Sequence, residues 1–211
     1  MITTKKLRFL NILEYPDLSI DTKQMNFITG KSGVGKSAFL KMLNRSNTVE
    51  KNSLFIDGID INTYNPIELR QKYLLCGQNV FLFNGSITSN FDQFYELRNM
   101  DAPSNETVQR FLTLVASTFN PNDKVDSMSG GERQRIYLAI FLSMAQEVLL
   151  LDEPTSALDK ETGHKVMSNI KAYCQENNLG CIIISHDDTL ATEFADRIIH
   201  LENIRLEVSH G

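Results

Sequence analysis

The segment NFITGKSGVGKSAFLKML, residues 26–43, places a glycine-rich loop between a short apolar stretch and an amphipathic one. Its centre, Gly30 to Ser37, satisfies the pattern G-x-x-x-x-G-K-[ST], with a predicted strand before the loop and a predicted helix after it. Such a loop turns backbone N–H groups and the positive end of the helix dipole toward a bound phosphate. We expect Lys36 to reach the terminal phosphates and the Ser37 hydroxyl to ligate Mg²⁺. The residues predicted to contact the phosphates are Gly30, Lys31, Ser32, Gly33, Val34, Gly35, Lys36, Ser37 and Ala38.

Two further apolar runs have the length of buried strands. They are EVLLLD, residues 147–152, and CIIIS, residues 181–185. The segment between them has helical periodicity, with Val166, Ile170 and Tyr173 on one face, and it ends at Gly180. A strand, a helix and a second strand, with both strands wholly apolar, predict a parallel sheet that is covered on both faces.

The rest of the chain divides into a β part and a helical part. Residues 6–28 alternate apolar and polar side chains in short pieces, which predicts a small antiparallel β part near the N-terminus. Residues 86–146 are mostly helical in pattern, and one predicted face there carries Val108, Phe111, Leu112 and Val115. We expect one domain over residues 1–211, with a core lobe of about 1–85 and 147–211 and a helical subdomain of about 86–146.

Polar side chains stand where predicted strands end. Asp152 and Glu153 close an apolar run, and Pro154 forbids the strand to continue. Because open α/β sheets bind ligands at the carboxyl ends of their strands, we expect Asp152 to hold Mg²⁺ and Glu153 to accept a proton from an attacking water. His186 follows another strand and suits a contact with the γ-phosphate, while the Gln78 amide can ligate Mg²⁺ and contact the water.

A second helix start with anion-binding character lies about a hundred residues after the phosphate loop. In SMSGGERQR, residues 127–135, Ser129, Gly130 and Gly131 precede a helical stretch, so their N–H groups form another anion-binding helix start. The loop at Gly30 to Ser37 already saturates one triphosphate. The sequence therefore predicts that the second start serves the nucleotide of another molecule.

Composition excludes several other classes of protein. The net charge of −5 and the pI of about 5.4 argue against a broad basic surface for nucleic acid. Cys76, Cys174 and Cys181 are odd in number and lack C-x-x-C spacing, so we expect buried thiols rather than disulfides or a zinc cluster. The N-terminus lacks a signal-peptide pattern, and the longest apolar stretch is far short of the ~20 residues of a membrane span. We expect a soluble, cytoplasmic protein.

Taken in order, these motifs resemble the ATP-binding cassette (ABC) ATPases over nearly the whole chain. Gly30 to Ser37 match the P-loop, Gln78 the Q-loop, MSGGE at 128–132 the family signature, LLLDEP at 149–154 the Walker B strand, Ser156, Ala157, Leu158 and Asp159 the D-loop, and His186 the switch histidine. The resemblance implies an α/β P-loop NTPase fold with a RecA-like parallel-sheet core, a small antiparallel β part and a helical subdomain.

The resemblance also implies an enzyme that hydrolyses ATP with Mg²⁺. Lys36, Gln78, Glu153 and His186 would be its catalytic residues, and Ser37, Gln78 and Asp152 would be its metal ligands. Two copies would form a head-to-tail dimer, in which the signature of one subunit closes on the ATP held by the P-loop of the other. The signature residues acting in trans would be Ser129, Gly130, Gly131 and Glu132.

Two departures from the family pattern concern the site. Met128 and Glu132 stand where the consensus signature has leucine and glutamine, which we interpret as tolerated variants with an effect on rate. The aromatic residue that stacks on adenine in this family has no clear match. Tyr15 is the candidate and Phe9 the reserve.

The leading functional hypothesis is an ATPase subunit that drives a separately encoded membrane permease, similar to compact bacterial ATPases of export type. Its partners would be a second copy of itself, or a homologous subunit, and the permease, which would hold it at the inner face of the cell membrane. Residues 79–100 would form the docking groove, where Phe81, Phe83, Phe91 and Phe94 concentrate aromatic area. The alternative is a soluble ABC ATPase in DNA repair or translation, although relatives of those kinds carry coiled-coil insertions or two cassettes per chain.

Overall fold

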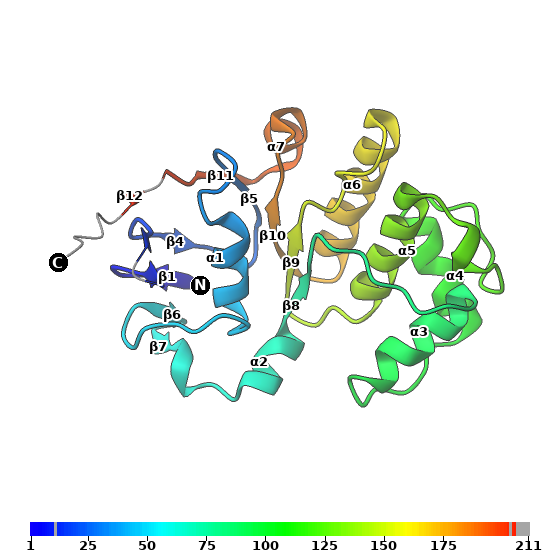
Figure 1. Cartoon of the computed structure of the whole chain (residues 1–211), viewed down its shortest axis with the longest axis horizontal. Coiled ribbons are helices and arrows are strands. Elements are labelled where there is room, and N and C mark those ends of the chain that lie inside the picture. The colour runs from blue at the N-terminus through cyan, green and yellow to red at the C-terminus, as the bar shows by residue number, and fades with distance from the viewer. Residues whose placement is uncertain (11, 203, 206–211) are drawn as a thin grey trace.

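The apolar runs of the sequence form a five-stranded parallel sheet through the middle of the protein, as a computed structural model of residues 1–10, 12–202 and 204–205 shows (Figure 1). The strand order is β11-β5-β10-β9-β8. The strands are β5 (Met25–Thr29), β8 (Tyr73–Cys76), β9 (Val148–Asp152), β10 (Gly180–Ile184) and β11 (Arg197–His200). Every residue of β5, β9 and β10 is buried, which confirms the predicted parallel sheet covered on both faces.

Alternate residues of the sheet supply two separate hydrophobic cores, because successive side chains of a strand point to opposite faces. Val148 and Leu150 of β9 pack with helix α1 (Lys36–Leu43) and the antiparallel strands. Leu149 and Leu151 pack in the other core, with helices that include α5 (Gly130–Ser143) and α6 (Lys160–Glu176). The sheet therefore separates a β-rich half of the protein from a helix-rich half.

A four-stranded antiparallel sheet covers α1 on the side away from the parallel sheet (Figure 1). Its order is β4-β1-β6-β7, from strands β1 (Ile2–Thr4), β4 (Ser19–Ile20), β6 (Leu54–Ile56) and β7 (Ile59–Asp60). The antiparallel β part is thus confirmed, but it is not confined to the N-terminal segment. Strand β6 pairs with β1 over its full length, because its buried Leu54 and Ile56 complete the same apolar face as Ile2.

A third small sheet, of order β12-β3-β2, lies beside the antiparallel sheet. Its strands are β2 (Arg8–Phe9), β3 (Leu13–Glu14) and β12 (Ile204–Arg205). The ion pair between Arg8 Nε and Glu14 Oε2, at 2.9 Å, fastens the β2–β3 hairpin across its two strands. The register that pairs Phe9 with Leu13 puts these two side chains next to each other.

The helix-rich half contains α3 (Ile87–Glu96), α4 (Asn105–Leu114), η2 (Val125–Ser127) and α5, and it lies to one side of the parallel sheet beside α6 (Figure 1). The predicted face of α4 is buried, with Val108, Phe111 and Leu112 inside and Val115 buried at the cap. The other helices are η1 (Ile61–Thr63), α2 (Pro66–Lys72) and α7 (Asp188–Phe194). Among the described residues, no helix is both long enough and apolar enough to cross a bilayer.

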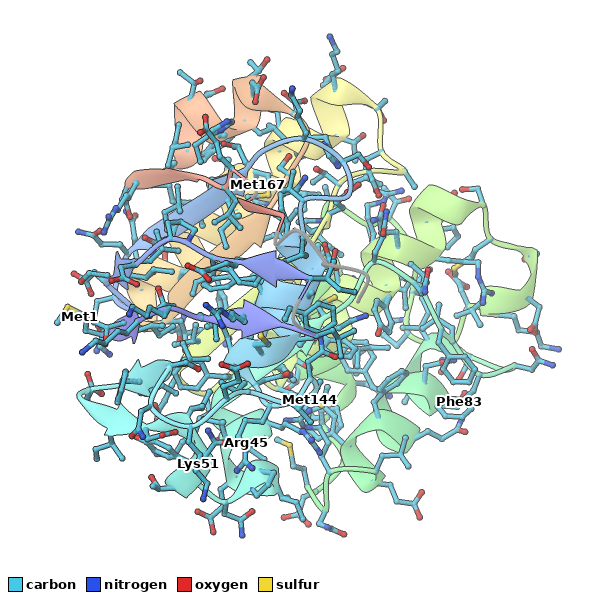
Figure 2. The ribbon with its side chains drawn as sticks, turned by 60° about the vertical axis from the view of Figure 1, so that its left-hand side comes forward. Met1, Arg45, Lys51, Phe83, Met144 and Met167 are labelled. Carbon is cyan, nitrogen blue, oxygen red and sulfur yellow. The ribbon has the colours of Figure 1, made fainter. Side chains whose placement is uncertain are left out.

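The aromatic residues after β8 do not all lie on the surface. Phe81 is 57% exposed, and Phe83 and Phe94 are half-buried, whereas Phe91 is completely buried. Including Phe91 in a surface patch was therefore wrong, because its position on α3 faces the helical core. Figure 2 labels Phe83 on the side of the helices, away from Met1. The three cysteines are buried free thiols, as predicted.

Candidate active site

Four neighbouring strands deliver the candidate site residues to one edge of the parallel sheet. The phosphate loop follows β5, His186 follows β10, Glu153 follows β9 and Gln78 follows β8. Because these strands are adjacent and parallel, their carboxyl ends open on one side of the sheet, where α/β folds bind their ligands. The order of the strands therefore brings together residues that lie more than a hundred positions apart.

The phosphate loop closes on its own lysine. Lys36 is the first residue of α1 and is 6% exposed, and its Nζ donates to the carbonyl oxygens of Gly30, at 2.7 Å, and Lys31, at 3.0 Å. Burial lowers the pKa of this ammonium group, and the nearby Glu153 and Asp152 carboxylates partly offset that effect. The lysine is thus placed inside the loop with two carboxylates within electrostatic reach.

Gly35 caps α1 with a left-handed conformation, φ +90°, and no side chain occupies the helix start. A Cβ at this position would lie 2.6 Å from Tyr15 Oη and 2.7 Å from Leu13 Cδ1. Only glycine fits there, for reasons of both conformation and space. The first N–H groups of α1 consequently remain available to a ligand.

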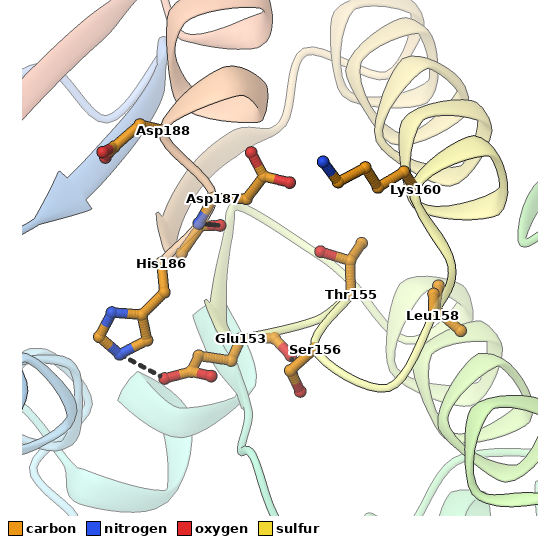
Figure 3. Close-up of a pocket in the computed structure, with 9 residues that line it drawn as sticks. Glu153, Thr155, Ser156, Leu158, Lys160, His186, Asp187 and Asp188 are labelled. Carbon is orange, nitrogen blue, oxygen red and sulfur yellow. Dashed lines mark hydrogen bonds and ion pairs between the residues drawn. The ribbon is translucent and has the colours of Figure 1, made fainter.

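Glu153 and His186 face each other across the strand ends, as Figure 3 shows, with His186 Nε2 and Glu153 Oε1 3.0 Å apart. Glu153 has φ +53°, a left-handed conformation that residues with a Cβ adopt infrequently. Its N–H donates to the Ile184 carbonyl of β10 at 3.0 Å. This backbone bond ties the end of β9 to the strand that carries His186, so the two side chains meet.

Two pockets share Glu153 and His186. The first, of about 420 Å³, contains most of the predicted phosphate contacts. It is lined by Phe9, Leu13, Ser32, Gly33, Gly35, Lys36, Ser37, Ala38, Gln78, Glu153 and His186. The second, of about 520 Å³, is the pocket of Figure 3, and it is lined by Glu153, Thr155, Ser156, Leu158, Lys160, Ser185, His186, Asp187 and Asp188. The Glu153–His186 pair therefore stands between a loop pocket and a pocket lined by the segment after β9.

Asp152 is buried and is not among the residues that line the first pocket. It is 5% exposed, and its Oδ1 has no hydrogen-bond partner among the described residues. A buried carboxylate oxygen without a partner is unfavourable unless a cation or a donor completes it. Asp152 thus has the properties of a metal ligand.

Tyr15 does not offer its ring to a base, so its assignment as the stacking residue was wrong. It is 4% exposed, and its Oη donates to the Gly35 carbonyl at 2.9 Å. Its ring packs on Phe39 with centroids 5.4 Å apart, and burial raises its pKa to about 12. Tyr15 supports the phosphate loop from below, while Phe9, the reserve candidate, is half-buried and lines the first pocket.

The second helix start, at Ser129, lines neither pocket. Ser129 caps α5 in a capping box, because its N–H and its Oγ both lie 2.7 Å from Glu132 Oε2, while its Oγ accepts from the Glu132 N–H. These hydrogen bonds from Ser129 lower the pKa of the Glu132 carboxyl group. Ser129 and Gly130 are exposed, and Gly131 and Glu132 are half-buried.

The segment Ser156 to Asp159 lies between β9 and α6, and it also contacts α5. Ser156 Oγ donates to the Glu153 carbonyl at 3.1 Å, and Ala157 N–H donates to Gln134 Oε1 of α5 at 2.9 Å. Leu158 packs against the helical core, and Asp159 caps α6 by accepting from Thr162 N–H at 2.9 Å. Within this segment, Asp159 has a structural role as a helix cap.

Comparison with known proteins identifies the family. Residues 13–156 match the ABC transporter family. The chain belongs to that family. It is 34% identical over 194 residues, 90% of this chain and 84% of the relative, to "Probable iron export ATP-binding protein FetA" of Escherichia coli (strain K12). It is also 34% identical over 203 residues, 90% of this chain and 73% of the relative, to "Phosphonates import ATP-binding protein PhnC 2" of Synechococcus sp. (strain JA-2-3B'a(2-13)).

Solved structures agree with the ABC assignment. A dimeric post-hydrolysis state of the ATP-binding cassette MJ0796, bound to ADP and Pi, matches with a TM-score of 0.78 at 25% identity, over 98% of this chain and 99% of that one. A bacterial Atm1-family ABC exporter with ATP bound matches with a TM-score of 0.83 at 25% identity, over 95% of this chain and 37% of that one. This chain is thus an ABC transporter ATPase subunit with the P-loop ABC ATPase fold.

Two site features of this ABC ATPase escaped the sequence patterns. Leu13 lines the first pocket because its strand pairs with that of Phe9, and only the hairpin register could have indicated it. Gln134, one turn into the signature helix, contacts the backbone beside Glu153. The sequence offers only a polar residue one turn before the apolar Leu138 as a signal for Gln134, and that signal does not indicate what Gln134 contacts.

Proposed function

We propose that this ABC ATPase works as a dimer of two copies, with each ATP held by the P-loop of one copy and the signature helix start of the other. The observation that carries the proposal is the exposed start of α5, where Ser129 and Gly130 lie outside both pockets. The chain's own phosphate loop is complete, so this second helix start would serve a second nucleotide, whose phosphate would replace the Glu132 carboxylate there. The dimeric cassette structures similar to this chain support the arrangement.

Hydrolysis would follow from the residues around the first pocket. A water attacks the γ-phosphorus in line, its oxygen forms the new bond to phosphorus, and the bond from phosphorus to the ADP oxygen breaks. Glu153 accepts the proton of that water, and His186, 3.0 Å from its carboxylate, holds the carboxylate in place and faces the γ-phosphate. Lys36 exchanges its two loop carbonyls for phosphate oxygens and neutralises the charge that develops there.

Mg²⁺ fits the donors that the described residues offer. The Ser37 hydroxyl, the Gln78 amide oxygen and the Asp152 carboxylate would hold it, and the unpartnered Oδ1 of buried Asp152 supports this assignment. When bound, the ion would neutralise phosphate charge and orient the transferred group. Phosphate and water oxygens would complete the coordination of Mg²⁺, so the site needs only one carboxylate from the protein. A cluster of three acidic, His or Cys side chains, which the described residues do not contain, is not required.

The base would stack on Phe9 rather than on Tyr15. Phe9 and Leu13 are the large apolar side chains that line the first pocket, which Lys36 and Glu153 also line. An aromatic face beside an aliphatic side chain suits the flat, apolar surface of adenine. The hairpin that carries them is fastened by the Arg8–Glu14 ion pair.

A membrane permease is the proposed partner, and the chain would lie at the inner face of the membrane by binding it. The exposed Phe81 stacks edge-on against Phe83, with centroids 4.8 Å apart, and Phe83 continues to Phe94 at 5.7 Å. An exposed aromatic ring seated on others suits the docking of an apolar helix. Affinity purification from solubilised membranes should recover an integral membrane protein with this chain, and its repeated absence would contradict the proposal.

The direction of transport is proposed as export. The resemblance to an Atm1-family exporter over 95% of this chain and to an iron export ATP-binding protein supports export. The equal identity to a phosphonates import protein is the competing observation. Transport by the chain with its co-purified permease in inverted vesicles tests the direction, since ATP added outside should drive uptake for an exporter.

The test of the shared ATP sites is the substitution Glu153→Gln. We expect turnover to fall by about 10²- to 10⁴-fold, because the proton acceptor is lost while the side chain keeps its shape. ATP binding should persist, so the variant should accumulate as an ATP-bound dimer on gel filtration. Glu161→Gln, an exposed change on α6, is the matched control and should behave like the wild type. Persistent hydrolysis by Glu153→Gln, with only monomer in ATP, would contradict the assigned role.

A further inference from the structure

Gln134 makes three contacts with the segment that carries Glu153. The side chain is 5% exposed, and it lies on α5, one turn after the signature helix begins. Its Nε2 donates to the Glu153 carbonyl at 3.0 Å and to Ser156 Oγ at 3.3 Å, and its Oε1 accepts from Ala157 N–H at 2.9 Å. Both ends of one buried amide are thus bonded to the chain just after β9.

These partners fix the orientation of the amide. The Glu153 carbonyl can only accept a hydrogen bond and the Ala157 N–H can only donate one. A reversed amide would therefore set oxygen against oxygen and N–H against N–H in a buried place. The side chain acts as a two-ended connector that neither an apolar residue nor a carboxylate of equal size can replace.

The contacts of Gln134 lie at and just after Glu153, whose backbone has an unfavourable left-handed conformation. Glu153 has φ +53°, and both of its backbone polar groups are bonded, the N–H to Ile184 and the carbonyl to Gln134 and Ser156. A residue with a Cβ keeps such a conformation only where its surroundings hold it. The Glu153 side chain, 3.0 Å from His186, follows the direction that this backbone sets.

The same helix carries the proposed trans contact. The position of Gly131 on α5 is also set against the segment, because a Cβ there would lie 2.7 Å from the Ala157 carbonyl oxygen. Gln134 therefore bonds the Ala157 N–H, while the lack of a side chain at Gly131 lets α5 approach the Ala157 carbonyl oxygen closely. A shift of the α5 start on binding the partner's nucleotide would reach Glu153 through this contact.

We infer that Gln134 is a positioning residue for hydrolysis, which holds the Glu153 backbone in its left-handed conformation and links the signature helix to the proton acceptor. The inference rests on the proposed role of Glu153. It assigns Gln134 no contact with ATP or water. Loss of the connector should therefore change the rate of turnover and leave the binding of ATP as it was.

The experiment replaces Gln134 with Met, which keeps the length of the side chain and removes all three hydrogen bonds. In steady-state assays of the full chain, we expect kcat to fall about 10- to 100-fold, because misplacing a catalytic group by about 1 Å costs on that order. The KM for ATP should stay at its wild-type value. Gln109→Met, the same change at an exposed position of α4, is the matched control and should leave both constants unchanged.

Amide hydrogen exchange supplies a readout in the absence of ATP. In Gln134→Met the Ala157 amide should exchange faster, while the Thr162 amide, bonded to Asp159 Oδ1, serves as an internal reference and should not change. Gln134→Glu separates the two ends of the connector, since it keeps the acceptor for Ala157 and loses the donor to Glu153. We expect protected Ala157 and low kcat in that variant, which also serves if the Met variant fails to fold.

Two results would overturn the inference. One is a wild-type kcat in folded Gln134→Met or Gln134→Glu. The other is a fall in kcat that only follows the fraction of unfolded protein. If Glu153→Gln abolishes turnover while these variants keep it, the inference about Gln134 fails and the proposed function stands. If Glu153→Gln itself turns over normally, the proposed function fails first.

Discussion

Helices α1 and α5 both have a glycine at their start, Gly35 as the N-cap of α1 and Gly130 as the first residue of α5, yet only the α5 start is capped by a side chain. The start of α1 has no side-chain cap and lies in a pocket, with Lys36 bonded to the loop carbonyls. The start of α5 is exposed and capped by its own Ser129 and Glu132. The α1 start is therefore shaped for a ligand that this chain holds, whereas the α5 start is stable by itself until something displaces its carboxylate.

The difference bears on how a shared site can assemble. The exposed α5 start lies where a nucleotide held by another copy can reach it, and a phosphate of that nucleotide would replace the Glu132 carboxylate at the helix start. An uncapped start buried in a pocket can hold the nucleotide before the second copy arrives. We expect the binding of ATP to depend on the start of α1, and the closure of the dimer to depend on the start of α5.

The largest effect is expected when one subunit carries a substitution at the α1 start and its partner carries a substitution at the α5 start. We expect Lys36→Ala and Ser129→Arg each to lower turnover by more than about 100-fold when alone. An equal mixture should recover roughly a quarter of wild-type turnover, since half of the dimers would contain one intact composite site. Activity is measured across mixing ratios, with each variant mixed with itself as the control. No recovery at any ratio would mean that the two starts do not share a site.

The second prediction compares the glycines at the two starts. Gly35→Ala should lower the free energy of unfolding by about 1–3 kcal/mol and weaken ATP binding, because φ is +90° and the Cβ would meet Tyr15 and Leu13. Gly130→Ala meets no atom within 4 Å and should stabilise the chain by up to about 1 kcal/mol while leaving ATP binding intact. Chemical denaturation and ATP titration measure both quantities. Equal effects at the two positions would refute the difference between the starts.

Base stacking should belong to the α1 site alone. Phe9→Ala should raise the KM for ATP about tenfold, because stacking of a base on an aromatic ring contributes roughly 1–3 kcal/mol. The kcat should remain unchanged, since stacking on the base would stabilise bound ATP and the transition state equally. Tyr15→Phe, which removes only the bond to the Gly35 carbonyl, is the comparison and should leave KM near the wild type. The reverse ranking of these variants would restore Tyr15 as the stacking residue.

The smallest effect is expected at Glu132. Its carboxylate accepts from Ser129 N–H and Oγ, so it places a negative charge where the proposed partner's phosphate would arrive. We expect Glu132→Gln to raise turnover a few-fold and to lower the free energy of unfolding by about 0.3–1 kcal/mol at neutral pH, because the helix start loses its anion.

The stability difference at Glu132 should depend on pH in a defined direction. Hydrogen bonds from Ser129 lower the pKa of this carboxyl below its ordinary value of 4.5. A lowered pKa in the folded state means that the stabilisation is complete above pH 4.5 and is lost as the pH falls through the lowered value. Thermal melts of wild type and Glu132→Gln should therefore differ at pH 7 and converge in acid. A constant difference across this range would contradict the contribution of the cap.

The sequence supported the phosphate loop, the covered sheet and the carboxylates after β9, because each depends on a local pattern of glycine or apolar residues. The base-stacking residue could not be found that way. Tyr15 is nearer to Gly35 in the sequence than Phe9, but Tyr15 is buried with its hydroxyl bonded to the Gly35 carbonyl, whereas Phe9 lines the pocket. Gln134 depends on how α5 lies against the segment after β9, which no local pattern encodes.

The Arg8–Glu14 hairpin has a consequence for engineering. Phe9 and Leu13 belong to a small sheet of their own, while Lys36, Glu153 and His186 follow strands of the parallel sheet. Under the proposed function, base preference and bond cleavage would reside in separable parts of the chain. Exchanging residues 8–14 for the hairpin of a relative should retune the choice between adenine and guanine nucleotides without rebuilding the hydrolytic machinery.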